Sequence, residues 1–208
     1  MELMPHNILQ FKHKEDLVSD LELPEWSAES IDHAPFAVIR RAPFKENLVP
    51  VGIRGKERNQ RFASYLPIDK IKTCISPLRL AKEKAWNKNI RIDAIKALSV
   101  LPALDGIISA YGMPWGPTGS IGFELATGMP AAKETSDLDA IVCLPQELPR
   151  KKAKRLAEEL NALPVPVDVQ IMTPFGGVAL MEYARGDKPL IMKTNNGPKF
   201  VEDPWSEK

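Results

Sequence analysis

The chain has 208 residues, of which 44% are hydrophobic and 26% charged, and its formal net charge at pH 7 is +1. This is the profile of an ordinary globular protein, and the near-zero charge argues against nucleic acid as a partner. The two cysteines are far apart, which excludes a disulfide framework and a cysteine-rich zinc site. Nothing in the sequence resembles a signal peptide or a membrane span of about 18 apolar residues, so we expect a cytoplasmic protein with no membrane contact.

The first part of the chain has the pattern of short strands separated by turns. Residues 36–41 and 48–54 are rich in Val, Ile and Phe, and Pro43 with its polar neighbours separates them. We therefore predict a smaller, β-rich amino-terminal domain over residues 1–80.

Residues 81–208 alternate between helical and strand patterns. A helical pattern covers 76–111 and is kinked or restarted at Pro102. The predicted elements that follow are a strand–turn–helix at 115–128, a strand at 139–144, a helix at 149–163, a strand at 166–171, a helix at 175–185 closed by Gly186, and a hairpin at 189–201. This order predicts an α/β (α+β) domain with a mixed sheet and flanking helices.

Three aspartates define the candidate chemical site. Asp137 and Asp139 stand two residues apart at the start of an apolar strand, so their side chains should share one face. Neighbouring carboxylates repel each other unless a cation lies between them, and hard oxygen ligands suit Mg²⁺. Asp168 stands between two valines of another short strand, where an unpaired carboxylate is costly to bury. A shared Mg²⁺ would account for all three, so we predict them as metal ligands and catalytic residues.

Gly119 and Ser120 precede the aspartates on the predicted turn between a strand and a helix. A glycine lets backbone N–H groups approach a phosphate with no Cβ in the way, and the serine adds a hydroxyl. Alone, a Gly-Ser pair more often marks a simple turn, and a lone Asp-x-Asp pair is more often a solvated turn or helix cap. Their order and the third carboxylate instead predict a metal-dependent nucleotidyl-transfer site, in which Gly119 and Ser120 bind substrate phosphates.

A basic stretch in the amino-terminal domain supplies further candidates, because residues 54–61 contain four cations. Guanidinium groups suit phosphate oxygens, since their forked donors can engage two oxygens together. We therefore predict that Arg54, Arg58 and Arg61 bind substrate. A solvated basic loop is the alternative interpretation.

These segments resemble those of one enzyme family, the phosphoribosyl-dephospho-CoA transferases that serve malonate decarboxylase, also called malonate decarboxylase holo-acyl-carrier-protein synthases. The resemblance covers nearly the whole chain, and the family is placed in the nucleotidyltransferase superfamily. The similar segments are 49–55, 60–63, 119–128, 136–139, 167–170, 179–186 and 203–205.

The resemblance implies a defined reaction that attaches a prosthetic group. The donor would be 2′-(5″-triphosphoribosyl)-3′-dephospho-CoA, and the acceptor a serine hydroxyl on the apo acyl-carrier subunit of malonate decarboxylase. Pyrophosphate would be released. Asp137 and Asp139 match the family's active-site positions, and Mg²⁺ would be the cofactor.

Two other functions stay open on the residues alone. One is a different Mg²⁺-dependent nucleotidyltransferase that adds a nucleoside monophosphate to a small molecule or to RNA. The near-zero net charge argues against the RNA substrate. The other is a catalytically silent module that binds the carrier protein, and the three mutually repelling aspartates argue against it.

Overall fold

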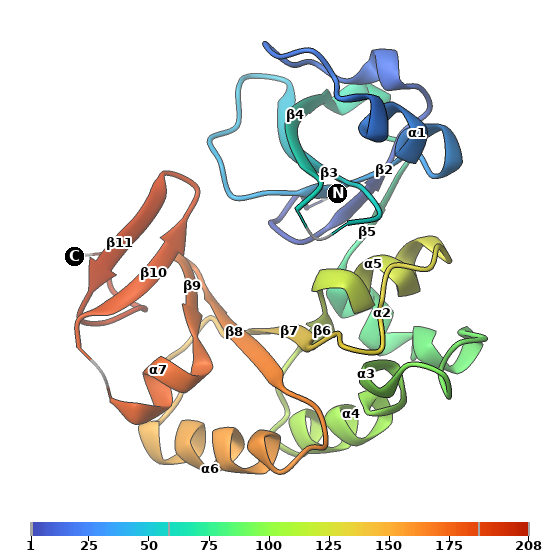
Figure 1. The fold of residues 1–208 in the computed structure, drawn as a ribbon. Coiled ribbons are helices and arrows are strands. Elements are labelled where there is room, and N and C mark those ends of the chain that lie inside the picture. Colours follow the sequence, from blue (N-terminus) through green and yellow to red (C-terminus); the bar gives the residue numbers. More distant parts are fainter. Residues whose placement is uncertain (1, 58, 187, 208) are drawn as a thin grey trace. The chain divides into compact units, whose positions relative to one another are not determined.

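The structure, a computed structural model, describes residues 2–57, 59–186 and 188–207. The chain divides into two compact units, Met1–Ser76 and Pro77–Lys208. Each unit has its own sheet and its own hydrophobic core (Figure 1). The predicted fold class is therefore confirmed: an antiparallel amino-terminal sheet domain is followed by a mixed sheet with helices. Within the described residues, no helix is both long and apolar enough to cross a bilayer.

The amino-terminal unit is built on an antiparallel sheet. Its elements are β1 (Ile8–Gln10), η1 (Lys14–Asp16), α1 (Glu25–His33), β2 (Phe36–Ile39), β3 (Leu48–Arg54), β4 (Arg61–Pro67), η2 (Ile68–Lys70) and β5 (Thr73–Ile75). In the part of the unit that the structure describes, the strand order is β4-β3-β2-β1-β5, and every pairing is antiparallel. The predicted strands at 36–41 and 48–54 are present as β2 and β3, and β2 is two residues shorter at its end.

The carboxyl-terminal unit is a mixed sheet with helices. Its elements are α2 (Pro77–Lys82), η3 (Ala85–Lys88), α3 (Lys96–Ser99), α4 (Leu101–Ala110), β6 (Trp115–Pro117), α5 (Gly119–Thr127), β7 (Leu138–Cys143), α6 (Arg150–Asn161), β8 (Val167–Thr173), β9 (Gly176–Ala179), α7 (Leu180–Arg185), β10 (Leu190–Thr194) and β11 (Gly197–Val201). The described strands follow the order β11-β10-β9-β8-β7-β6. β7 and β8 pair in parallel, and the other neighbours pair antiparallel.

The parallel pair exists because α6 carries the chain back between β7 and β8. α6 is amphipathic: Ala153, Leu156, Ala157 and Leu160 are buried, and most of its charged residues are exposed. In Figure 1, α4 and α6 lie along one side of the sheet, and they pack against each other. The helix predicted at 149–163 is thus confirmed, and it fixes the direction of β8.

Two predicted helices differ from the structure. The helical pattern at 76–111 is divided into α2, η3, α3 and α4, and the last helix restarts with Pro102 in its first turn, where a missing N–H costs nothing. The helix predicted at 175–185 is wrong at its start, because residues 176–179 form β9 and the helix begins at Leu180. Its predicted end at Gly186 is confirmed, with φ of 88° at that glycine.

Tyr183 anchors the packing between α6, α7 and the carboxyl-terminal tail. Its hydroxyl donates to the carbonyl of Leu148 at 2.6 Å. The Arg150 guanidinium lies 3.8 Å from the centre of the Tyr183 ring, and Trp205 packs edge-on against the same ring. Trp205 in turn donates its indole N–H to the Leu144 carbonyl at 2.9 Å.

Burial raises the pKa of Tyr183 to about 12, and this predicts an alkaline limit to stability. The folded state favours the neutral form of Tyr183. The contribution of Tyr183 to the free energy of unfolding is therefore complete below the unfolded pKa of about 10 and is lost as pH rises toward about 12. We expect the free energy of unfolding in denaturant to fall from pH 9 to pH 11 more steeply in the wild type than in Tyr183→Phe. Equal slopes in the two proteins would contradict the assignment.

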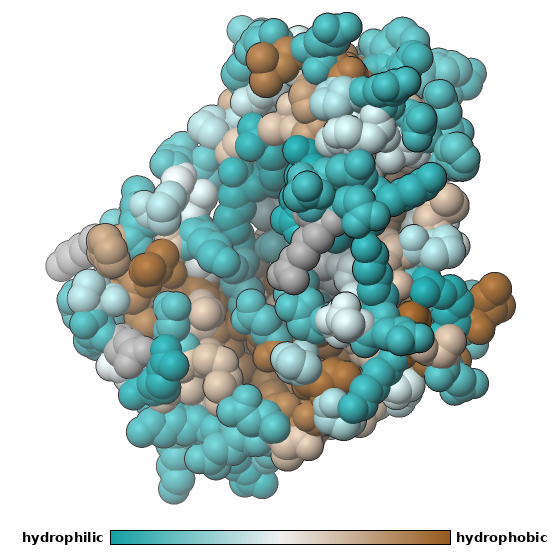
Figure 2. All heavy atoms as spheres, in the orientation of Figure 1, coloured by the Kyte–Doolittle hydropathy of each residue, from teal (hydrophilic) through white to brown (hydrophobic). Residues whose placement is uncertain are grey.

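The hairpin of β10 and β11 carries exposed apolar side chains. Ile191 and Phe200 are paired across the two strands and are 45% and 75% exposed. Figure 2 shows hydrophobic atoms gathered over this hairpin at the left of the view.

β11 also contains Pro198 and Lys199 and is an edge strand of the described sheet. The predicted hairpin at 189–201 is thereby confirmed.

Candidate active site

Asp139 and Asp168 lie side by side on neighbouring parallel strands. The register of β7 and β8 pairs Asp139 with Asp168, directly after the pair of Leu138 with Val167. Residues paired in this way project from the same face of a sheet, so the two carboxylates share one face. Both stand at the second position of their strands. The structure thus brings together two of the three predicted aspartates from segments that α6 separates in sequence.

Gly119 is packed against Asp139 at the start of α5. Its φ is +60°, a conformation that favours glycine, and a Cβ built on it would lie 2.0 Å from Oδ2 of Asp139. The preceding residue, Thr118, donates its backbone N–H to the Asp139 carbonyl at 2.8 Å. Both the conformation and the close approach therefore require glycine here. The predicted Gly-Ser turn and the predicted carboxylate strand meet at this point.

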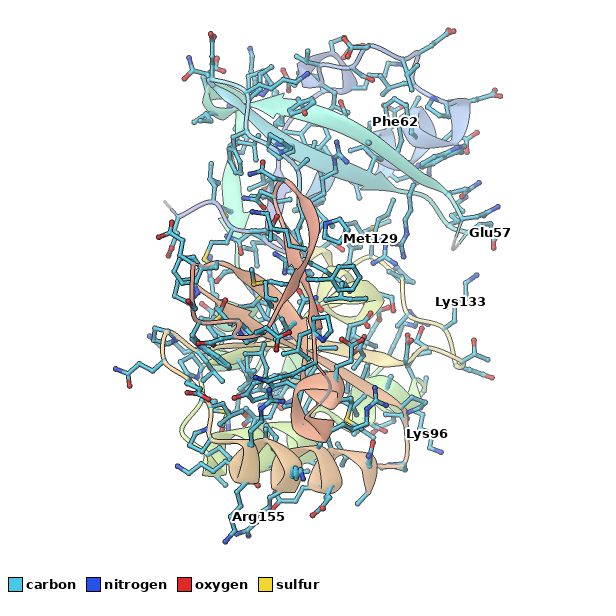
Figure 3. All side chains as sticks on the ribbon, turned by 90° about the vertical axis from the view of Figure 1, so that its left-hand side faces the viewer. Glu57, Phe62, Lys96, Met129, Lys133 and Arg155 are labelled. Carbon is cyan, nitrogen blue, oxygen red and sulfur yellow. The ribbon has the colours of Figure 1, made fainter. Side chains whose placement is uncertain are left out.

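Ser120 is tied to the loop that leads into β7. Its hydroxyl donates to Oγ of Ser136 at 3.4 Å, and the backbone N–H of Lys133 donates to the same oxygen at 2.9 Å. The Lys133 side chain extends away from this loop (Figure 3). Ser120 therefore stands beside the Asp-x-Asp segment, as predicted from sequence, although its hydroxyl bonds to Ser136.

Asp137 is exposed and lies just before β7, so it is outside the regular strand. In the described part of the chain, no three His, Cys, Asp or Glu side chains form a cluster that could hold a metal ion by themselves. Mg²⁺ at phosphoryl-transfer sites needs only one or two carboxylates, because water and substrate phosphates complete its shell. The pair of Asp139 and Asp168 fits that requirement. The metal and its three ligands stay a prediction.

Sequence reasoning missed the residue that supports this loop, Glu124. Glu124 is 1% exposed, although it is charged. Its carboxylate accepts from Nη1 of Arg91 at 2.8 Å and from the backbone N–H of Ala132 at 2.9 Å. One signal was present: Glu124 is the single charged residue of helix α5. Its partner, 33 residues earlier in the chain, carried no signal.

Models of one protein family match both units of the chain. The model described as "Phosphoribosyl-dephospho-CoA transferase MdcG N-terminal domain" matches residues 4–77, and the corresponding C-terminal domain model matches residues 80–204. The chain belongs to the phosphoribosyl-dephospho-CoA transferase family.

Curated relatives agree with this placement. A phosphoribosyl-dephospho-CoA transferase of Azotobacter vinelandii is 36% identical over 204 residues, which cover 98% of this chain and 94% of that protein. One of Pseudomonas putida strain GB-1 is 35% identical over 97% of this chain and 95% of its own length. One of Pseudomonas aeruginosa strain PAO1 is 36% identical over 88% and 85%. No solved structure matches the chain.

The family resemblance that the motifs indicated is therefore confirmed, and with it the general activity. The protein is an enzyme, a phosphoribosyl-dephospho-CoA transferase. The match spans both units, so the β-rich amino-terminal unit is as much a part of the transferase family pattern as the unit that carries the aspartates.

The basic residues predicted to bind the transferase's substrate lie on β3 and β4. Arg54 and Arg61 are directly paired across the two strands. Arg61 is exposed and Arg54 is half-buried, and both point away from the core face that carries Ile53 and Phe62. Arg58 lies outside the described residues.

Proposed function

We propose that this transferase moves the phosphoribosyl-dephospho-CoA group from 2′-(5″-triphosphoribosyl)-3′-dephospho-CoA to a serine hydroxyl of the apo acyl-carrier subunit of malonate decarboxylase. The observation that carries the proposal is the in-register pair of Asp139 and Asp168 beside the Gly119 turn. This arrangement places two carboxylates next to a helix start in a chain of the transferase family.

The proposed reaction is a displacement at phosphorus. The serine oxygen of the carrier attacks the α-phosphorus of the donor's triphosphate, and a new phosphodiester bond forms. The bond from that phosphorus to the bridging oxygen of the β-phosphate breaks, and pyrophosphate leaves with the electron pair. The serine proton passes to a carboxylate of the site, for which Asp168 is the proposed acceptor. Positioning and charge neutralisation supply most of the rate enhancement in such reactions.

Each predicted site residue then has a role. Asp139 and Asp168 would hold Mg²⁺, and Asp137 is the third predicted ligand. Mg²⁺ when bound neutralises phosphate charge and stabilises the leaving pyrophosphate. The backbone at Gly119 and the hydroxyl of Ser120 would contact the β- and γ-phosphates. For the hydroxyl, this contact replaces the 3.4 Å bond to Ser136.

The paired arginines of the amino-terminal unit are proposed as further substrate ligands. Arg54 and Arg61 would take a phosphate of the donor between their two guanidinium groups, with Arg58 as the third proposed ligand.

The same features support placement in the nucleotidyltransferase superfamily. A strand, β6, turns through Gly119 into a helix, and the next strand, β7, brings in the Asp-x-Asp segment. A parallel neighbour, β8, supplies the third carboxylate. The order of strand, Gly-Ser turn, helix and carboxylate strand is the pattern from which we predicted nucleotidyl transfer.

Intact-mass spectrometry of the carrier tests the proposal. Apo carrier subunit of malonate decarboxylase is incubated with this protein, Mg²⁺ and the triphosphoribosyl donor. We expect a mass gain equal to the phosphoribosyl-dephospho-CoA group, and no gain when the carrier's acceptor serine is replaced by alanine. EDTA in excess over Mg²⁺ should abolish the gain.

Other outcomes would overturn parts of the proposal. A gain that persists in EDTA rules out the proposed metal. If only ATP or CTP supports a gain, and that gain equals a nucleoside monophosphate, the chain is a different nucleotidyltransferase. No gain with any donor would overturn the proposed pair of donor and acceptor.

A further inference from the structure

A buried ion pair lies beneath the loop that leads to the aspartates. Glu124, in the second turn of α5, is 1% exposed, and its Oε2 lies 2.8 Å from Nη1 of Arg91. The Arg91 side chain is 29% exposed, so the pair is half-buried at the arginine and fully buried at the carboxylate. A carboxylate in such a place is costly unless donors surround it.

Both partners of the pair bind the backbone of the same dipeptide. Oε2 of Glu124 accepts the N–H groups of Ala131 and Ala132, each at 2.9 Å. Nη2 of Arg91 donates to the Ala132 carbonyl at 3.0 Å. The Asn89 amide adds a fourth donor to the carboxylate at 3.2 Å. The pair is therefore a clamp on Ala131 and Ala132.

The clamp acts on the segment that delivers the aspartates. Ala132 stands five residues before Asp137 in the sequence. Two further bonds tie the same segment to the start of α5: Ser120 to Ser136 and the Thr118 N–H to the Asp139 carbonyl. α5 thus holds the loop at Glu124 as well as at its first turn. The helix that begins with the Gly-Ser turn also sets where the Asp-x-Asp segment lies.

We propose that Glu124 and Arg91 are positioning residues for the transfer reaction: they fix the loop 131–136 so that Asp137 and Asp139 stand correctly against the start of α5. The inference rests on the proposed role of those aspartates. A buried ion pair is a poor source of stability, because apolar side chains of similar volume often serve as well or better. The hydrogen bonds of this pair to the backbone of Ala131 and Ala132 instead favour a role in fixing the position of the loop.

The chain offers a matched control for this pair. Arg79 and Glu83 on α2 form an ion pair with the same 2.8 Å separation between nitrogen and oxygen. The Glu83 side chain is 53% exposed, against 1% for Glu124. Glu83→Gln therefore removes a similar charge contact at an exposed place.

The first test compares the kinetics of Glu124→Gln, Arg91→Lys and Glu83→Gln. Each is assayed at a temperature at which its circular dichroism spectrum matches that of the wild type. We expect kcat per folded molecule to fall about 100-fold in the first two, because misplacement by about 1 Å is enough for that loss. The KM for the donor should change by less than about threefold, and Glu83→Gln should match the wild type. Unchanged kcat per folded molecule in Glu124→Gln and Arg91→Lys would overturn the proposal.

The second test measures amide hydrogen exchange and needs no donor. We expect faster exchange in Arg91→Lys at Ala131, Ala132 and residues 133–139, with unchanged exchange in α6. Arg91→Lys keeps the positive charge beside Glu124, so it can still be measured if Glu124→Gln does not fold. Uniformly faster exchange, including α6, or wild-type exchange at Ala131 and Ala132, would overturn the clamp. The two proposals can fail separately. If the wild type does not modify the carrier, the proposed function has failed. If Arg91→Lys still shows faster exchange only in the loop, Glu124 and Arg91 do hold that loop in place.

Discussion

Asp139→Asn should lower the rate of carrier modification by about 10³-fold while the protein stays folded. The substitution keeps the size of the side chain and removes the charge that faces Asp168 in the adjacent strand. A loss of that size corresponds to about 4 kcal/mol of transition-state stabilisation, as expected when a charge that neutralises or orients phosphate is removed. The rate is followed by intact mass of the carrier, and folding by circular dichroism.

Glu158→Gln is the control for the removal of one negative charge. Glu158 is exposed on α6 and should be replaceable with no change in rate. A rate within about threefold of wild type in Asp139→Asn would remove this carboxylate from the proposed mechanism. Equal loss in both variants would point to a general effect of charge.

Gly119→Ala should abolish detectable transfer and destabilise the protein. The new methyl group would stand 2.0 Å from Oδ2 of Asp139, so either the carboxylate or the helix start has to move. The φ of +60° adds strain for any residue with a Cβ. We expect the free energy of unfolding in urea to fall by about 2–3 kcal/mol.

Gly128→Ala separates these two effects. Gly128 has φ of +73°, and a Cβ there would meet nothing within 4 Å. The free energy of unfolding of Gly128→Ala should therefore fall by about 1 kcal/mol from backbone strain alone, and the variant should keep its transfer activity. If Gly119→Ala behaves like Gly128→Ala in both assays, the close contact between Gly119 and Asp139 is not required for transfer.

The elements around the proposed site were predictable because their side-chain patterns are strong. β7 is an apolar run, and α6 repeats buried residues at helical spacing, so both could be located from sequence within a few residues. Gly119 at a strand-to-helix turn followed from residue type alone. The family resemblance then supplied the reaction, which no pattern of hydrophobicity contains.

The amino-terminal unit was less predictable because two of its strands are very short. β1 and β5 have three residues each, too few for an alternation to be detected, and both were missed. The longer strand β4 was missed as well, although its residues alternate. The short helix α1 was also missed. Pairing with neighbouring strands, rather than local preference, determines β1 and β5.

In the carboxyl-terminal unit, Gly176 and Gly177 misled the prediction, because a residue without a side chain contributes to no pattern. Their strand forms through pairing with β8 and β10. The pair of Arg91 and Glu124 was hidden for a related reason, since it depends on a contact between residues 33 apart.

The edge strand β11 has a consequence for handling the protein at high concentration. An unpaired strand edge beside exposed apolar residues such as Phe200 is a template for association with another chain. Pro198 lacks the N–H that a continuous ladder needs, and Lys199 places a charge on the same strand. Solubility at this edge therefore depends on Pro198 and Lys199, and a β-branched residue in place of Pro198 would make the edge prone to aggregation.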